Sequence, residues 1–113
     1  MDGFAPLPDP PYWAVIFTNQ RHEDDAGYAA MAEAMDALAA KQPGYIGIES
    51  VRAADDGTGI TVSYWKSEAD LLAWKKVAEH EGAQRLGRER WYKHYRLRVA
   101  KVERSYSGPE GRG

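Results

Sequence analysis

The sequence contains no cysteine, and this absence excludes disulfide bonds, thiolate nucleophiles and cysteine-ligated zinc together. Long apolar runs are also missing, since no segment approaches the roughly 20 apolar residues of a membrane-spanning helix. Residues 1–11 have neither the basic start nor the apolar core of a secretory signal peptide. We therefore expect a cytoplasmic protein that has no membrane partner.

The composition is that of an ordinary globular domain. The chain has 113 residues, of which 43% are hydrophobic and 28% charged, which is enough for one domain. Residues 85–104 hold 8 basic and 2 acidic side chains, interleaved with aromatic residues, and such a segment could attract an anion. The net charge of the whole chain is −2 and no nucleic-acid motif is present, so we expect no nucleic-acid partner.

Hydrophobic periodicity predicts six main elements within a domain over residues 12–106. Residues 12–20 are aromatic and β-branched and predict a strand, and a helix follows over 26–41 with Asp24 and Asp25 as its caps. Further along, the pattern predicts strands at 45–53 and 60–66, a helix from 67 to about 79, a short helix after Gly82 and a final strand at 91–106. Four prolines make residues 1–11 an extended arm, and residues 107–113 form a flexible tail.

The order β-α-β-β-α-β predicts a ferredoxin-like α+β sandwich, in which two helices cover one face of an antiparallel sheet. Both faces of that sheet are apolar: Trp13, Val15 and Phe17 alternate with Tyr12, Ala14 and Ile16. Each apolar face of a sheet must be buried against another layer of structure, and the two helices can bury only one of them. We therefore expect a homodimer through the sheet face that the helices leave open.

Several segments resemble the antibiotic biosynthesis monooxygenase family. They are QPGYIGIES at residues 42–50, ITVSYWKSE at 60–68, AWK at 73–75 with His80, and LGRERWY at 86–92. The resemblance covers residues 12–106 and implies a dimeric α/β barrel built from two ferredoxin-like sheets. Some members of this family oxidise polycyclic aromatic substrates with oxygen and without metal or organic cofactor, whereas others bind and degrade haem.

The resemblance implies a pocket between the sheet and its helices. His80 is the candidate base, because an imidazole titrates near neutral pH, and Asn19 is the candidate donor to a substrate oxygen. Arg21 could hold an anionic group. Each candidate aromatic could equally belong to the hydrophobic core. The aromatic candidates for substrate binding are Phe17, Tyr64, Trp65, Trp74 and Trp91.

These residues predict a cofactor-independent monooxygenase that oxidises a small aromatic or quinol-like metabolite, with no metal. Haem-degrading relatives use an asparagine, a tryptophan and a histidine ligand, for which Asn19, Trp74 and His80 are the nearest counterparts. The tryptophan and histidine are six positions apart here, against about ten in those relatives, and six positions separate them by about 120° around a helix. Haem therefore remains an alternative, as does a non-catalytic dimer that binds a hydrophobic ligand.

Overall fold

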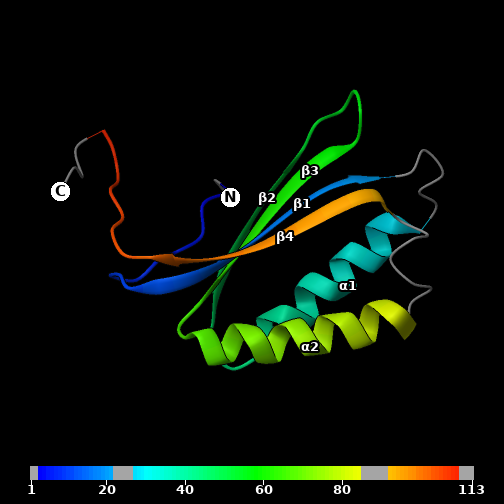
Figure 1. Ribbon diagram of the computed structural model, residues 1–113. Helices are drawn as coiled ribbons and strands as arrows, with labels where there is room; N and C mark the ends of the chain where they lie inside the picture. Colours follow the sequence, from blue (N-terminus) through cyan, green and yellow to red (C-terminus); the bar gives the residue numbers. More distant parts are fainter. Residues whose placement is uncertain (1–2, 22–26, 85–91, 110–113) are drawn as a thin grey trace.

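A four-stranded antiparallel sheet with two helices on one face forms the architecture in the computed structural model, which describes residues 3–21, 27–84 and 92–109 (Figure 1). The strand order is β2-β3-β1-β4, which confirms the ferredoxin-like arrangement. The elements are β1 (Tyr12–Arg21), α1 (Tyr28–Ala40), β2 (Tyr45–Arg52), β3 (Thr58–Trp65), α2 (Glu68–Gln84) and β4 (Tyr92–Val102). Neither helix in these ranges is long and apolar enough to cross a membrane.

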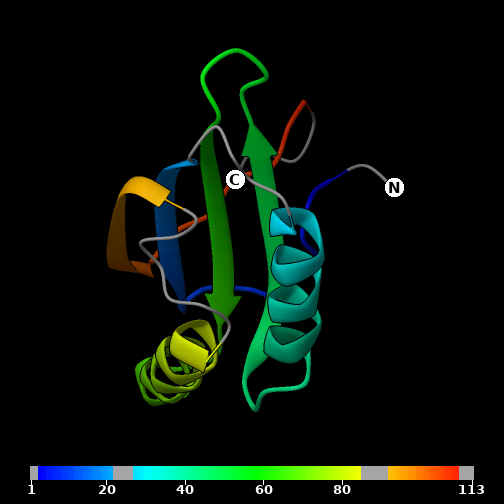
Figure 2. The same ribbon diagram turned by 90° about the vertical axis from the view of Figure 1, so that its right-hand side faces the viewer.

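Strand register decides which side chains face the helices. In β1, Val15 is paired with Ser63 of β3 on one side and with Val99 of β4 on the other. Because side chains alternate along a strand, Val15, Phe17 and Asn19 share the helix side of β1, and Ile16 lies on the opposite side. We call that opposite side, which the helices do not cover, the open face of the sheet (Figure 2).

The core lies between the sheet and the first turns of α2. Trp65 and Leu71 have no exposed surface, and they pack with Val15 and Ala39. The Trp65 indole Nε1 donates to Ser63 Oγ at 2.9 Å, so its one polar atom is satisfied inside the core. Trp65 therefore anchors the end of the sheet against both helices.

Two helix boundaries differ from the prediction. α1 begins at Tyr28, and its N-cap is Gly27 with φ 84°, without a side-chain hydrogen bond. The predicted caps, Asp24 and Asp25, lie outside the described residues. α2 continues through Gly82 to Gln84, so the predicted break at Gly82 is wrong, because one glycine costs a helix only about 1 kcal/mol. The predicted short helix that would follow lies outside the described residues.

The final strand is shorter than predicted. β4 ends at Val102, four residues before the predicted end at residue 106. Val102 pairs with Tyr12, the first residue of β1, so β4 has no partner strand beyond this point. Pro10 and Pro11 precede Tyr12 and have no N–H groups to extend the ladder.

The N-terminal segment crosses the open face of the sheet near β2. The backbone N–H of Ala5 donates to Glu49 Oε2 at 2.9 Å, and the Tyr64 hydroxyl donates to Glu49 Oε1 at 2.6 Å. Gly47 leaves room for this segment, because a Cβ there would lie 2.8 Å from the Cβ of Ala5. The first residues of the described chain thus cover part of the open face.

Candidate functional site

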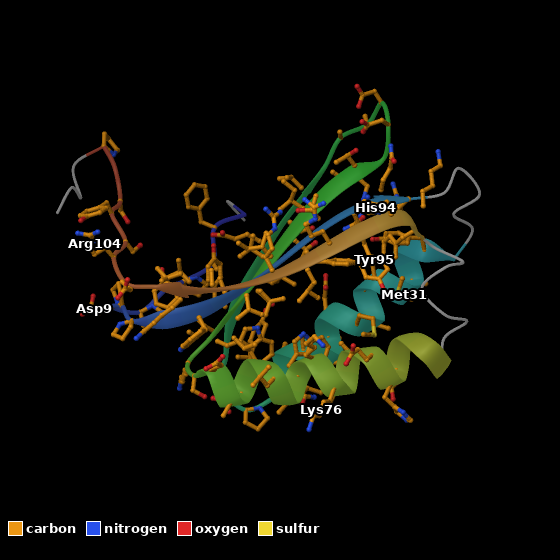
Figure 3. The ribbon with its side chains drawn as sticks, viewed as in Figure 1. Asp9, Met31, Lys76, His94, Tyr95 and Arg104 are labelled. Carbon is orange, nitrogen blue, oxygen red and sulfur yellow. The ribbon has the colours of Figure 1, made fainter. Side chains whose placement is uncertain are left out.

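A cavity of about 520 Å³ lies between the helix side of the sheet and the two helices. Met31 of α1 and Tyr95 of β4 both line it, toward the end of the sheet away from the chain termini (Figure 3). A cavity of this size can enclose a small organic molecule. Its main apolar lining residues are Val15, Phe17, Met31, Met35, Trp74 and Leu97.

Arg52 is the cation in the cavity wall whose hydrogen-bond partners, among the residues that the structure describes, are all neutral. Its Nη2 donates to Asn19 Oδ1 and to the Tyr28 hydroxyl, each at 2.8 Å, and its Nη1 donates to the carbonyl of Gly57. A Cβ on Gly59, on the neighbouring strand, would lie 2.6 Å from Arg52 Cζ, so this glycine makes space for the guanidinium. The arrangement fixes a positive charge beside Tyr28.

Aromatic side chains surround the Arg52 end of the cavity. The ring centroids of Phe17 and Tyr92 are 5.3 Å apart and those of Tyr28 and Tyr92 are 5.8 Å apart, both edge to face. The Tyr92 hydroxyl donates to the Tyr28 hydroxyl at 3.3 Å. Burial, followed by this hydrogen bond, raises the pKa of Tyr92 well above its ordinary value. Tyr92 therefore stays protonated and acts as a donor.

Asp36 supplies a carboxylate to the α1 wall of the cavity. Partial burial raises its pKa above the ordinary value of 3.8, and no hydrogen bond or ion pair joins this carboxylate to any part of the described chain. The other acidic lining residue, Glu79, pairs with Lys75 at 3.3 Å. Asp36 is thus the better placed of the two to accept a proton.

Three of the predicted site residues lie at or beside this cavity. Phe17 and Trp74 line it, and the Trp74 ring stacks on Trp65 with centroids 5.9 Å apart. Asn19 is 3% exposed and lies next to the cavity, where its Oδ1 accepts from Arg52. Its Nδ2 is buried and finds no acceptor among the residues that the structure describes.

The other predicted residues lie elsewhere. Trp65 is in the core beside Trp74, and Tyr64 is on the open face of the sheet, where it bonds Glu49. The Arg21 guanidinium lies 4.6 Å from the centre of the Tyr28 ring. His80 is exposed on α2 and does not line the cavity. Trp91 lies outside the described residues.

The cavity lacks the histidine ligand that the resemblance to haem-degrading members implied, among the residues that the structure describes. No histidine of the described chain lines the cavity, because His80 is exposed on α2 and His94 is exposed on the open-face side of β4. A haem placed there would find no imidazole for its iron among these residues. We therefore assign no chemical step to this group.

Sequence reasoning did not single out Arg52, Asp36 or Tyr28 as site residues. Tyr28 and Asp36 are eight positions apart on α1, which separates them by about 80° around the helix, within the width of one helix face, and this was a usable signal. No comparable spacing in the sequence identifies Arg52 as a site residue. Its role depends on the pairing of β2 with β3, which sets it opposite Gly59.

The sequence comparisons agree on one family. The sequence model of antibiotic biosynthesis monooxygenase matches residues 14–86, which include Asn19, Asp36 and Arg52. The chain is 52% identical over 104 residues to the uncharacterized protein YqjZ of Bacillus subtilis, covering 92% of this chain and 90% of that protein. It is 30% identical over 102 residues to the jasmonate monooxygenase ABM of Pyricularia oryzae, covering 87% of this chain but only 46% of that protein.

Solved structures show the same fold. SnoaB, a cofactor-independent oxygenase from Streptomyces nogalater, superposes with a TM-score of 0.67 at 14% identity, covering 85% of this chain and 97% of that one. Rv0793 from Mycobacterium tuberculosis gives a TM-score of 0.70 at 16% identity, covering 85% and 99%. These likenesses concern the fold alone. The match of the family model over residues 14–86, more than half of the chain, shows that the chain belongs to the antibiotic biosynthesis monooxygenase family.

Proposed function

We propose that this protein is a cofactor-independent monooxygenase that oxidises a small aromatic or quinol-like metabolite with dioxygen. The observation that carries the proposal is that one apolar cavity contains both the Asp36 carboxylate, which has no hydrogen bond or ion pair among the described residues, and the side chains of Arg52 and Tyr28. A cavity without a titratable group would have favoured a binding protein that has no turnover. The family and the names of its oxygenase and monooxygenase relatives support the same reading.

The reaction begins with proton removal. Asp36 takes a proton from an acidic methylene of the substrate, and the electron pair of that C–H bond spreads over the ring system to an oxygen substituent. The resulting anion reduces dioxygen. Overall, one methylene and one dioxygen give one carbonyl and one water, so the substrate itself supplies all four electrons and no external reductant is needed.

The remaining groups position the substrate and stabilise the anion. In this proposal Arg52 and Tyr28, which both line the cavity, donate to the substrate oxyanion, and such donors in an apolar cavity can stabilise a transition state by several kcal/mol. Phe17 and Trp74 offer flat surfaces for aromatic rings. The backbone positions of Tyr28 and Asp36 are about 12 Å apart along the axis of α1, so the two side chains would contact different parts of a bound ring system.

Oxygen uptake with dithranol tests the proposal. Dithranol is an aromatic compound whose acidic methylene lies between two phenolic rings, so it has the reactive group that the cavity chemistry requires. We expect metal-free protein in the presence of a chelator to consume oxygen faster than the uncatalysed background and to release the quinone. Uptake no faster than the background for dithranol and related anthrones would contradict a monooxygenase of this class.

We further propose that two chains pair through the open face of the sheet. On this face Val51 is 71% exposed and Ile60 is 42% exposed, although both are apolar strand residues. A second copy of the same face, packed by twofold symmetry, would bury both. The dimer leaves the cavity, on the opposite side of the sheet, accessible.

The substitution Ile60→Lys should convert the dimer to a monomer. A lysine on each copy brings two charges into an apolar interface, which is strongly unfavourable unless they are paired. Light scattering after gel filtration should show twice the chain mass of 12.6 kDa for the parent protein and the single mass for the variant. Leu72→Lys, at a residue of α2 that is 46% exposed, is the control and should stay dimeric. A monomeric parent protein would rule out this interface.

A further inference from the structure

The charge of Arg52 has no compensation in the described chain. Its three hydrogen bonds within the described chain go to neutral acceptors, namely Gly57 O, Asn19 Oδ1 and the Tyr28 hydroxyl, and no carboxylate of the described residues forms an ion pair with it. A guanidinium has five N–H donors, so some remain after these three bonds. A partly buried cation without a counter-ion is unfavourable, and an anionic ligand would remove that penalty.

The position of this charge is built into the sheet. Arg52 Cζ lies 5.2 Å from the centre of the Tyr28 ring, and the carbonyl of Gly57 and the amide of Asn19 accept hydrogen bonds from the guanidinium. Gly59 has no side chain to displace it. Ordering the guanidinium before the ligand arrives reduces the entropy lost on binding.

A second donor lies beside the guanidinium. Asn19 is 3% exposed, and its Nδ2 finds no acceptor among the described residues. Its Oδ1 is already fixed by Arg52 at 2.8 Å, so the amide is held next to the same charge. A buried donor without an acceptor is rare in folded proteins, and a ligand oxygen would satisfy it.

We infer that the cavity selects aromatic anions, with a carboxylate or phenolate oxygen docked on Arg52 beside Asn19 and the ring body lying between Phe17 and Trp74. This inference rests on the proposed function, since it names the substrate class of the same cavity. It gives Arg52 a role in choosing the substrate before any reaction begins. Neutral aromatic molecules of the same shape can pack against the apolar walls of the cavity, but they leave the Arg52 guanidinium without a counter-ion.

Binding of matched ligands tests the inference without requiring turnover. Naphthoate and the neutral amide naphthamide have the same ring body and nearly the same shape. We expect isothermal titration of the parent protein to give naphthoate an affinity about 10- to 100-fold higher than that of naphthamide, because a charge-assisted hydrogen bond contributes this much. Equal affinities for the two ligands would overturn the inference while leaving an aromatic cavity, and hence the proposed function, intact.

The variant Arg52→Met should remove the preference by weakening naphthoate about 10- to 100-fold and leaving naphthamide unchanged. Arg104→Met, in the exposed C-terminal segment far from the cavity, is the charge-matched control and should keep the preference (Figure 3).

A naphthoate preference that survives in Arg52→Met would also overturn the inference. If Arg52→Met does not fold, the affinities of the two ligands are compared in Arg52→Gln instead. The comparison of naphthoate with naphthamide on the parent protein tests the preference for an anion without any variant. Failure of both ligands to bind would overturn the inference, and the oxygen-uptake assay with dithranol would then decide separately whether the proposed function holds.

Discussion

Replacing Asp36 by asparagine should lower the rate of dithranol oxidation by about 100- to 10,000-fold, the usual contribution of a general base. Asparagine has nearly the same shape but cannot accept the methylene proton. The folded protein should tolerate the change, since Asp36 makes no hydrogen bond or ion pair within the described residues and its pKa is already raised by burial. Stopped-flow absorbance of the quinone product, corrected for uncatalysed oxidation, measures the effect.

The pH dependence provides a second signature of Asp36. A base acts in its ionised form, and a raised pKa means that protonation begins at higher pH than for an ordinary aspartate. In the parent protein kcat/KM should therefore fall as pH drops toward a midpoint above 3.8, and this acid limb should vanish in the asparagine variant. Glu33→Gln, on an exposed position of α1, is the control. It should keep both the oxidation rate and the fall of kcat/KM at low pH. An unchanged profile in Asp36→Asn would assign the base elsewhere.

The substitution Trp65→Ala should lower the free energy of unfolding by about 3–5 kcal/mol, as expected when a fully buried tryptophan is truncated. Trp65 has no exposed surface, packs on Leu71 and Val15, and supports Trp74 in the cavity wall. The loss would leave a cavity in the core and remove the hydrogen bond to Ser63. Urea unfolding followed by circular dichroism, at one fixed protein concentration, measures the change.

Two matched variants separate the contributions of Trp65. Trp65→Phe keeps most of the packing but loses the Nε1–H donor to Ser63, and should be destabilised by only about 1–2 kcal/mol. Leu72→Ala, at a residue of α2 that is 46% exposed, should change stability by less than about 1 kcal/mol. A loss for Trp65→Ala no larger than that of Leu72→Ala would contradict the core described here.

The fold was largely predictable because its periodic signals are local. Alternation in residues 12–20 and helical spacing after Tyr28 depend on near neighbours, so the order of elements and the face assignment of Val15 and Phe17 follow from the sequence. The predictions that were wrong concern the ends of helices and strands. Whether β4 stops at Val102 depends on where its distant partner, β1, begins at Tyr12. α2 continues past Gly82 because the small penalty of one glycine does not end a helix.

The candidate site was less predictable because it depends on contacts between distant strands. Phe17, Trp74 and Asn19 were found as residue types that suit a pocket, and the structure sets them at or beside the cavity. Arg52 is 33 positions from Asn19, and only strand pairing shows that they meet. His80 is predicted as the base from its imidazole chemistry and from the resemblance, neither of which fixes its position, and its exposed place on α2 depends on helix phase relative to the sheet.

Labelled dioxygen tests the central claim, a cofactor-independent monooxygenase, most directly. Metal-free protein would be mixed with dithranol under isotopically labelled dioxygen in ordinary water, and the product would be analysed by mass spectrometry at once, before exchange. The account predicts one labelled oxygen atom in each new carbonyl, no hydrogen peroxide, and loss of the protein-dependent product in Asp36→Asn. Hydrogen peroxide as the oxygen product, or a new carbonyl oxygen derived from water, would contradict it.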